Sequence, residues 1–225
     1  MSTQNSEQIE NHLLFNKNPI PFKKNRILQI IIFLFLIGWV LTAIRPINWT
    51  YYLLENIPMA LIIIILSIFY KRLQLSNFSY LLIALFFLMN AFGAHYDYGK
   101  TPIDEWLKDT FEIKGKYYDL IVHFGYGLLM AYPIKELLSQ YTKLYTFWLY
   151  IFIFSLIVSF SGTFEIIEML VNKITNPNNP EKHLGLHHDP FNTQKDMSMA
   201  WLGAFLAIVI MIIVNSRKKK IRVNY

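Results

Sequence analysis

The sequence predicts an all-α fold, a polytopic membrane helical bundle with about six transmembrane helices, and three observations carry this prediction. The chain has 225 residues, of which 54% are hydrophobic, and its mean hydropathy is +0.33. Charged residues make up only 16% of it, against about 25% in typical soluble proteins. The apolar residues are gathered in long runs, and a helix needs about 20 of them to cross the hydrocarbon core.

Six apolar runs match that length, and each is bounded by polar or charged residues. Because backbone groups in lipid must be satisfied internally, these runs are expected to be helices. The expected spans cover residues 27–44, 51–70, 78–95, 117–134, 144–170 and 196–214. After the third span, the Thr101-Pro102 start predicts a short interfacial helix. The chain is thus expected to have a polar N-terminal tail at 1–26, one membrane domain at 27–216 and a basic C-terminal tail at 217–225.

Basic residues set the expected orientation of the spans. Lysine and arginine gather before the first span, at Lys71-Arg72, at Lys135 and Lys143, and in the C-terminal tail. By the positive-inside rule these segments face the cytoplasm, so both termini are expected there. The net charge of +6 is then a feature of membrane topology, and we expect the lipid bilayer as a partner and no nucleic acid. The chain has no cysteine, which excludes disulfides and thiolate chemistry.

This topology brings polar side chains from several helix ends to the outer face of the membrane. Asp119 and His123 are four residues apart, and Glu165 and Glu168 are three apart, so each pair shares one helix face. An ionisable residue at membrane depth costs at least ~2.5 kcal/mol, so we expect these groups to face the bundle interior or a water-filled cavity. Further pocket residues are expected from other helix ends, namely Glu55, His95, Tyr96, Asp189 and Thr193.

Carboxylates and histidines in one cavity suit a divalent cation, acid–base chemistry, or both. Asp119, His123 and Asp196 are the predicted metal ligands, for zinc, manganese or magnesium according to how many histidines take part. Glu165 or Glu168 is the predicted general base. The alternative is structural, since each acid lies near a helix end where simple solvent exposure explains it. The loop histidines His183, His187 and His188 are as typical of a solvated surface as of a set of metal ligands.

Four segments together resemble the YjdF-like family of bacterial inner-membrane proteins. They are HYDYGKTPIDEWL at 95–107, YDLIVHF with Asp119 and His123, FEIIE in the fifth span, and DPFNTQKDM at 189–197. The resemblance implies a location in the bacterial inner membrane and supports the choice of site residues, but it implies no particular reaction. Where the loop motif of the family is expected to carry aspartate, this chain has Asn192. The arrangement is more distantly similar to VanZ-like proteins, although this chain lacks an arginine beside its late acids.

Three function classes fit this pattern. The leading one is an envelope enzyme or accessory protein that acts on a lipid-linked or phospho-containing molecule with the help of a divalent metal. The second is an ion- or proton-coupled transporter using the same acids, although the acids lie near one face and no inverted repeat is evident. The third is a non-catalytic membrane scaffold in which the polar groups satisfy one another.

Overall fold

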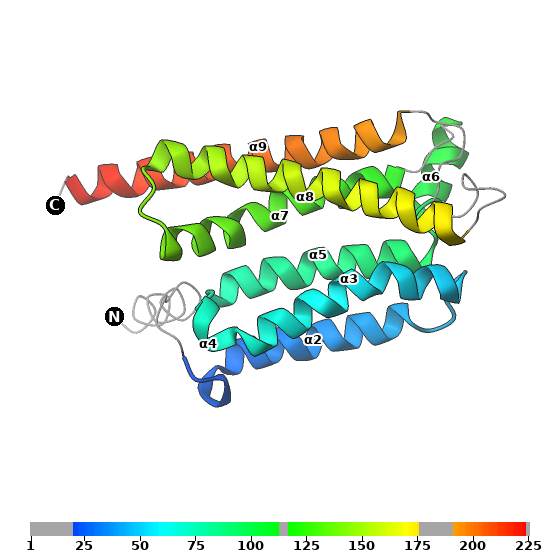
Figure 1. Cartoon of the computed structure of the whole chain (residues 1–225), viewed down its shortest axis with the longest axis horizontal. Helices are drawn as coiled ribbons and strands as arrows, with labels where there is room; N and C mark the ends of the chain where they lie inside the picture. Colours follow the sequence, from blue (N-terminus) through cyan, green and yellow to red (C-terminus); the bar gives the residue numbers. More distant parts are fainter. Residues whose placement is uncertain (1–19, 113–116, 176–190, 224–225) are drawn as a thin grey trace. The chain divides into compact units, whose positions relative to one another are not determined.

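The structure is a computed structural model that describes residues 20–112, 117–175 and 191–223. Every regular element within these ranges is a helix, which confirms the predicted all-α class (Figure 1). The helices group into two compact units, Met1–Tyr96 and Asp97–Tyr225, and each is described by itself. The expected partition into two tails and one membrane domain at 27–216 stays a prediction.

The N-terminal unit contains three long helices. The 3-10 turn η1 (Phe22–Lys24) precedes α2 (Arg26–Thr42), which is followed by α3 (Trp49–Ile68), the short α4 (Tyr70–Leu73) and α5 (Asn77–His95). Consecutive long helices run in opposite directions (Figure 1), and both α2 and α3 pack on α5. Polar side chains cap each start, because Asn25, Asn48 and Ser76 accept hydrogen bonds from backbone amides in the first turns of α2, α3 and α5.

Buried polar contacts join these helices at both ends. Asn25 and Asn77 exchange two side-chain hydrogen bonds, of 2.8 and 3.0 Å, which tie the start of α2 to the start of α5. At the opposite end of α2, the Trp39 indole donates to the Asn56 side-chain oxygen at 2.8 Å. Such pairs satisfy polar groups whose burial would otherwise cost free energy, so they fix the alignment of the helices along their axes.

The C-terminal unit contains one short and three long helices. They are α6 (Pro102–Phe111), α7 (Tyr117–Tyr141), α8 (Thr146–Thr175) and α9 (Asn192–Val223). α7 and α9 run in the same direction and α8 runs against them (Figure 1). Their shared core combines alanines from α7 and α9 with larger side chains from α8 and one methionine from α9: Ala131, Leu149, Tyr150, Ile153, Ile157, Ala204, Ala207 and Met211. The unit therefore buries a continuous apolar seam along three helices.

Within the described residues, four helical segments are long and apolar enough to cross a membrane, namely Trp49–Ile68, Asn77–His95, Thr146–Val171 and Asn192–Arg217. α2 is apolar but only 17 residues long, at the lower limit of a span. α7 has 25 residues and is long enough, but it carries several charged groups. It packs against α8 and α9, so most of its surface needs no lipid-compatible side chains. The helical membrane bundle is confirmed, and the number of six spans stays a prediction.

Candidate functional site

Asp104 on α6 fixes the start of α7. Its Oδ1 accepts hydrogen bonds from the backbone amides of Tyr117 and Tyr118, at 2.7 and 3.0 Å. Its Oδ2 accepts from the Thr101 hydroxyl at 2.7 Å, and that hydroxyl accepts from the Asp104 amide, capping α6. A buried carboxylate thus satisfies two of the open amides at a helix N-terminus, where negative charge is also favoured by the helix dipole. The first turn of α7, which carries Asp119, is thereby held in place.

Glycine residues allow the backbones of α7 and α9 to come into direct contact. A Cβ atom on Gly127 would overlap the carbonyl oxygen of Ala200, and one on Gly203 would overlap that of Phe124. Small residues at a helix interface permit such close packing in membranes. The contact lies one turn beyond His123 on α7 and one turn beyond Asp196 on α9, so the two polar side chains are brought together at the end of a tight helix–helix seam.

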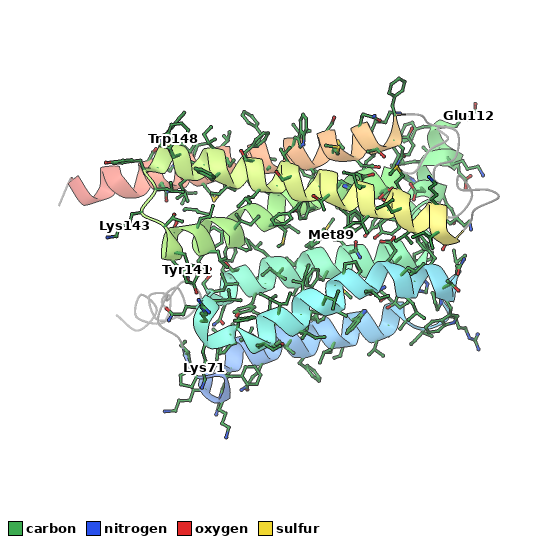
Figure 2. The ribbon with its side chains drawn as sticks, in the orientation of Figure 1. Lys71, Met89, Glu112, Tyr141, Lys143 and Trp148 are labelled. Carbon is green, nitrogen blue, oxygen red and sulfur yellow. The ribbon has the colours of Figure 1, made fainter. Side chains whose placement is uncertain are left out.

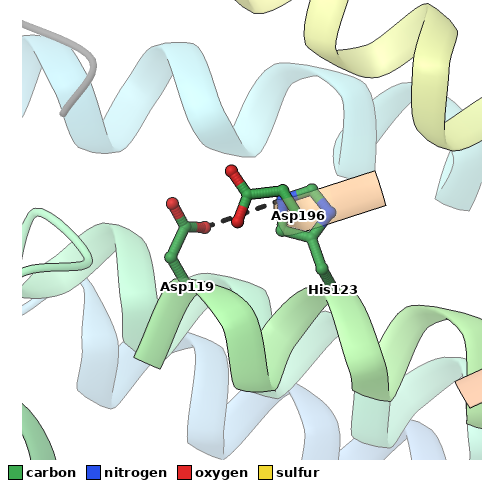
Figure 3. A group of neighbouring side chains, drawn as sticks. All are labelled: Asp119, His123 and Asp196. Atoms are coloured by element: carbon green, nitrogen blue, oxygen red, sulfur yellow. Dashed lines mark ion pairs between the residues drawn. The ribbon is translucent and has the colours of Figure 1, made fainter. Parts of the chain in front are cut away.

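Three ionisable side chains meet there, as Figure 3 shows. Asp119 and His123 come from α7 and Asp196 from α9, and each offers one ligand atom such that all three atoms lie within 4.8 Å of one another. His123 Nε2 lies 3.7 Å from Asp119 Oδ1. His123 is 8% exposed and Asp196 only 1%, so this is a buried cluster rather than a surface group.

Glu165 on α8 adds a third helix to the cluster. Its Oε1 lies 3.4 Å from His123 Nε2, and the residue is 5% exposed. Among the described residues this oxygen accepts no hydrogen bond, while the Thr193 side chain donates one to the Glu165 carboxylate. A buried carboxylate oxygen without a donor is costly unless a cation or a proton is supplied. Glu165 therefore places its open acceptor oxygen beside His123 Nε2, next to the group of three ligand atoms but not within it.

Asn192 and Thr193 in the first turn of α9 complete the surroundings of the site. Asn192 Nδ2 donates to Asp196 Oδ2 at 2.6 Å, so the residue that departs from the expected aspartate orients a predicted ligand. Thr193 reaches Glu165, as described above. α9 begins at Asn192, and the predicted pocket residue Asp189 lies outside the described residues, as do His183, His187 and His188.

The other predicted pocket residues take separate places. Glu168 is half-buried one turn further along α8 and is not in the group of three ligand atoms. Glu55, His95 and Tyr96 belong to the N-terminal unit. There His95 Nδ1 hydrogen-bonds the carbonyl oxygen of Thr42 at 2.7 Å, and its own carbonyl accepts from the Ile47 amide at 3.0 Å. His95 thus closes the connection between α2 and α3 onto the end of α5.

The donor set of the cluster fits a divalent cation. One imidazole nitrogen and two carboxylates are ligands that zinc accepts, and catalytic sites keep three protein ligands and an open position. Manganese and magnesium also accept carboxylate oxygens. Three carboxylates around one histidine would repel one another without a counter-charge, and a cation relieves that repulsion. Metal binding by Asp119, His123 and Asp196 stays a prediction, and the structure brings their ligand atoms within 4.8 Å of one another.

Asp104 is the residue that the sequence analysis missed. Its signal is present in the chain, because Thr101 followed three residues later by an acid is typical of a capped helix start. That pattern predicts capping of α6 alone. The second role, accepting the amides of Tyr117 and Tyr118, depends on the fold and has no local sequence signal.

Comparison with known proteins supports the resemblance drawn from the sequence. Residues 27–217 match the family described as "Predicted membrane protein (DUF2238)". A relative in Escherichia coli K12, the inner membrane protein YjdF, is 26% identical over 165 residues, which cover 71% of this chain and 77% of the relative. The YjdF-like resemblance is confirmed. No solved structure matches the chain significantly.

Proposed function

Because the chain belongs to the DUF2238 family of predicted membrane proteins, we propose that it is a multi-pass inner-membrane protein that binds one divalent metal ion. The proposed ligands are Asp119, His123 and Asp196. The name of the E. coli relative supports the location, and the convergence of three ligand atoms within 4.8 Å supports the metal. That convergence is the observation on which the proposal depends.

The metal site is proposed to serve chemistry on a lipid-linked or phospho-containing molecule at the outer face of the membrane. A divalent ion polarises a phosphoryl or carbonyl oxygen and stabilises negative charge that develops in the transition state. Glu165 stands beside the ligand group with an open acceptor oxygen, which suits a general base. Asn192 and Thr193 donate hydrogen bonds to Asp196 and Glu165, respectively, which supports a fixed orientation for each carboxylate.

Metal content tests the first part of this proposal. Protein purified gently in detergent is analysed for metals, alongside Asp196→Asn and the matched control Asp109→Asn, an exposed acid on α6. We expect about one zinc or manganese per chain in the wild type and the control, and at least a tenfold loss of bound metal in Asp196→Asn. No metal in the wild type, together with no thermal shift on adding zinc, manganese or magnesium, would falsify the metal site.

Separating metal binding from chemistry tests the second part. Glu165→Gln keeps the size of the side chain but removes the base, so metal should remain bound while turnover of a lipid-linked phosphate substrate falls by about 10²–10⁴-fold. The assay needs a substrate screen with reconstituted protein and with inorganic phosphate release as the signal. Metal-dependent ion uptake into proteoliposomes, without any turnover, would instead favour a transporter and overturn the enzyme proposal.

A further inference from the structure

An apolar groove of about 380 Å³ lies in the N-terminal unit, among α2, α3 and α5. Leu28 and Phe35 of α2, Ile63 and Leu66 of α3, and Ala84 and Phe87 of α5 line it. The volume lies in the range of small-molecule pockets, about 300–1,000 Å³, and nearly all lining side chains are aliphatic or aromatic. The groove belongs to a different unit from the metal cluster and does not depend on the proposed function.

Hydrogen bonds bound the groove at both ends. At one end Trp39, which lines the groove, donates to Asn56 at 2.8 Å and so joins α2 to α3. At the other end the Tyr70 hydroxyl donates to the Ile20 carbonyl at 2.8 Å and accepts from Asn25 at 3.3 Å. The segment before α2 is thus tied to the start of α4, just beyond α3, and the groove lies between these two contacts.

The side of the groove opens to the apolar surface of the unit. Ile32 and Leu36 line it and are 37% and 45% exposed, and the neighbouring Phe33 is 63% exposed. Exposed large apolar side chains on an apolar helix face the hydrocarbon of the bilayer. The groove mouth is therefore bordered by exposed apolar side chains, which suits contact with an acyl chain.

One end of the groove carries a cluster of positive charge. Phe22 and Tyr70 line that end, and the residues adjoining them in the chain are Lys23, Lys24 and Lys71, all exposed. Figure 2 shows Lys71 on α4, at the end of the unit where α2 begins. Lysine and arginine at the edge of a membrane span attract anionic head groups, at about 1 kcal/mol for each residue near the surface. The charge and the apolar slot together match a phosphate on a fatty-acyl tail.

We propose that this groove is a binding site for one anionic phospholipid, with an acyl chain between α2 and α3 and the phosphate on Lys24 and Lys71. The hydrocarbon end is recognised by shape and apolar contact, and the head group by charge. A zwitterionic lipid with the same tails fits the groove but lacks the net charge. Binding should therefore favour phosphatidylglycerol over phosphatidylcholine.

Native mass spectrometry of the full chain tests this proposal. Delipidated protein in detergent is titrated with phosphatidylglycerol or phosphatidylcholine of identical tails, and the apparent Kd of the first lipid is measured. We expect saturable binding of one phosphatidylglycerol, at least fivefold tighter than phosphatidylcholine. Inorganic phosphate at millimolar concentration should not compete, because it lacks the tail. No saturable binding, or equal binding of the two lipids, would overturn the proposal.

Paired variants locate the bound lipid. Ala84→Phe fills the slot and should weaken binding of both lipids at least tenfold, whereas Leu85→Phe, at the next and exposed position of α5, should not. Lys24→Gln with Lys71→Gln should remove the preference for phosphatidylglycerol and leave tail binding intact. Lys108→Gln with Lys143→Gln, which removes the same charge in the other unit, should preserve the preference.

Two outcomes would assign the groove to another occupant. Lipid binding that appears only after removal of residues 1–19 would show that the N-terminal tail fills the groove in the whole protein. If the groove residues become less accessible to solvent as the protein concentration rises, a second copy of the chain covers the groove. If Ala84→Phe does not fold, as judged by gel filtration, Ile63→Phe from α3 serves as the second filling variant, and unchanged lipid binding in it contradicts the proposal.

Discussion

His123 on α7 and Glu165 on α8 meet in the interior of the C-terminal unit, with His123 Nε2 3.4 Å from Glu165 Oε1. The same nitrogen lies 3.7 Å from Asp119 Oδ1, so one imidazole stands between carboxylates of two helices. Groups this close share protons and counter-charges. The charge state of each side chain in the cluster therefore depends on the others.

Energetic coupling within the cluster is the first prediction. Two double-mutant cycles on the free energy of unfolding, one pairing Asp119→Asn with Glu165→Gln and one pairing His123→Ala with Asp196→Asn, should each show coupling of about 0.5–3 kcal/mol. The physical reason is that removing one member changes the charge that the remaining members must tolerate. Additive effects in both cycles would show that these residues do not act as one site. Asp109→Asn paired with Glu165→Gln is the control and should be additive.

Metal preference is the second prediction. Zinc favours imidazole nitrogen, whereas manganese and magnesium favour oxygen ligands. His123→Ala should therefore abolish the rise in melting temperature caused by zinc while leaving part of the rise caused by manganese. In the wild type, a metal at 100 times its Kd should stabilise the fold by about 2.7 kcal/mol. An equal loss for both metals in His123→Ala would contradict the prediction that the histidine favours zinc over manganese.

The third prediction concerns the contact between α7 and α9. Gly127→Ala places a methyl group against the Ala200 carbonyl, so the two helices must separate, and overpacking of this kind costs about 1–3 kcal/mol. Because His123 and Asp196 lie on either side of that seam, the variant should also weaken metal binding. Gly162→Ala on α8 is the matched control, since its methyl would meet only the flexible end of Met197 at 3.3 Å. Equal metal affinity in both variants would contradict the role of the seam.

The fourth prediction concerns the cap supplied by Asp104. Asp104→Ala leaves the amides of Tyr117 and Tyr118 without their acceptor and should cost about 1–3 kcal/mol, measured by thermal unfolding in detergent. Asp104→Asn keeps one acceptor oxygen and should cost less. Glu105→Gln, at the next and exposed position of α6, is the control and should change the melting temperature little. If Asp104→Ala is as stable as Glu105→Gln, the start of α7 is held by other contacts.

Long apolar runs made most of the fold predictable. The span expected at 78–95 is α5 (Asn77–His95), and the span expected at 51–70 is α3 (Trp49–Ile68). The end of α7 was less predictable, because the span expected at 117–134 stops at the charged pair Lys135-Glu136. The helix continues to Tyr141, with Glu136 buried and the Lys135 ammonium 5.7 Å from the centre of the Tyr132 ring. Tertiary contacts thus accommodate charged residues that, in a hydropathy pattern, indicate the end of a membrane span.

The sequence predicted which candidate site residues share a helix face, but not which of them come together in the folded protein. Helical spacing placed Asp119 and His123 on one face, and the structure brings both to Asp196. Spacing does not tell which helix ends adjoin, because that depends on the close contact of α7 and α9 at Gly127 and Gly203, and the spacing of charged residues does not reveal that contact. Glu168 has the same spacing signal as Glu165, yet Glu165 is the one beside His123.

The topology of the membrane spans is the last prediction. Lys143 lies between α7 and α8, and Glu112 follows α6 at the opposite end of the C-terminal unit (Figure 2). In the N-terminal unit, Lys24 and Lys71 lie at one end, because contacts of Tyr70 with Ile20 and Asn25 join those segments. By the positive-inside rule, the ends with Lys24, Lys71 and Lys143 face the cytoplasm and α7 crosses the membrane.

The natural absence of cysteine makes this topology directly measurable. Single cysteines at Glu105, Lys24 and Lys143 are labelled in spheroplasts with a membrane-impermeant maleimide, before and after permeabilisation. We expect Glu105→Cys to react in intact spheroplasts, and Lys24→Cys and Lys143→Cys only after permeabilisation. If Lys143→Cys reacts from outside together with Glu105→Cys, α7 does not cross. The cluster of Asp119, His123 and Asp196 would then lie on a re-entrant helix, and the count of six spans would be wrong. If Lys24→Cys reacts from outside and Glu105→Cys does not, the whole orientation is reversed, and the metal cluster faces the cytoplasm.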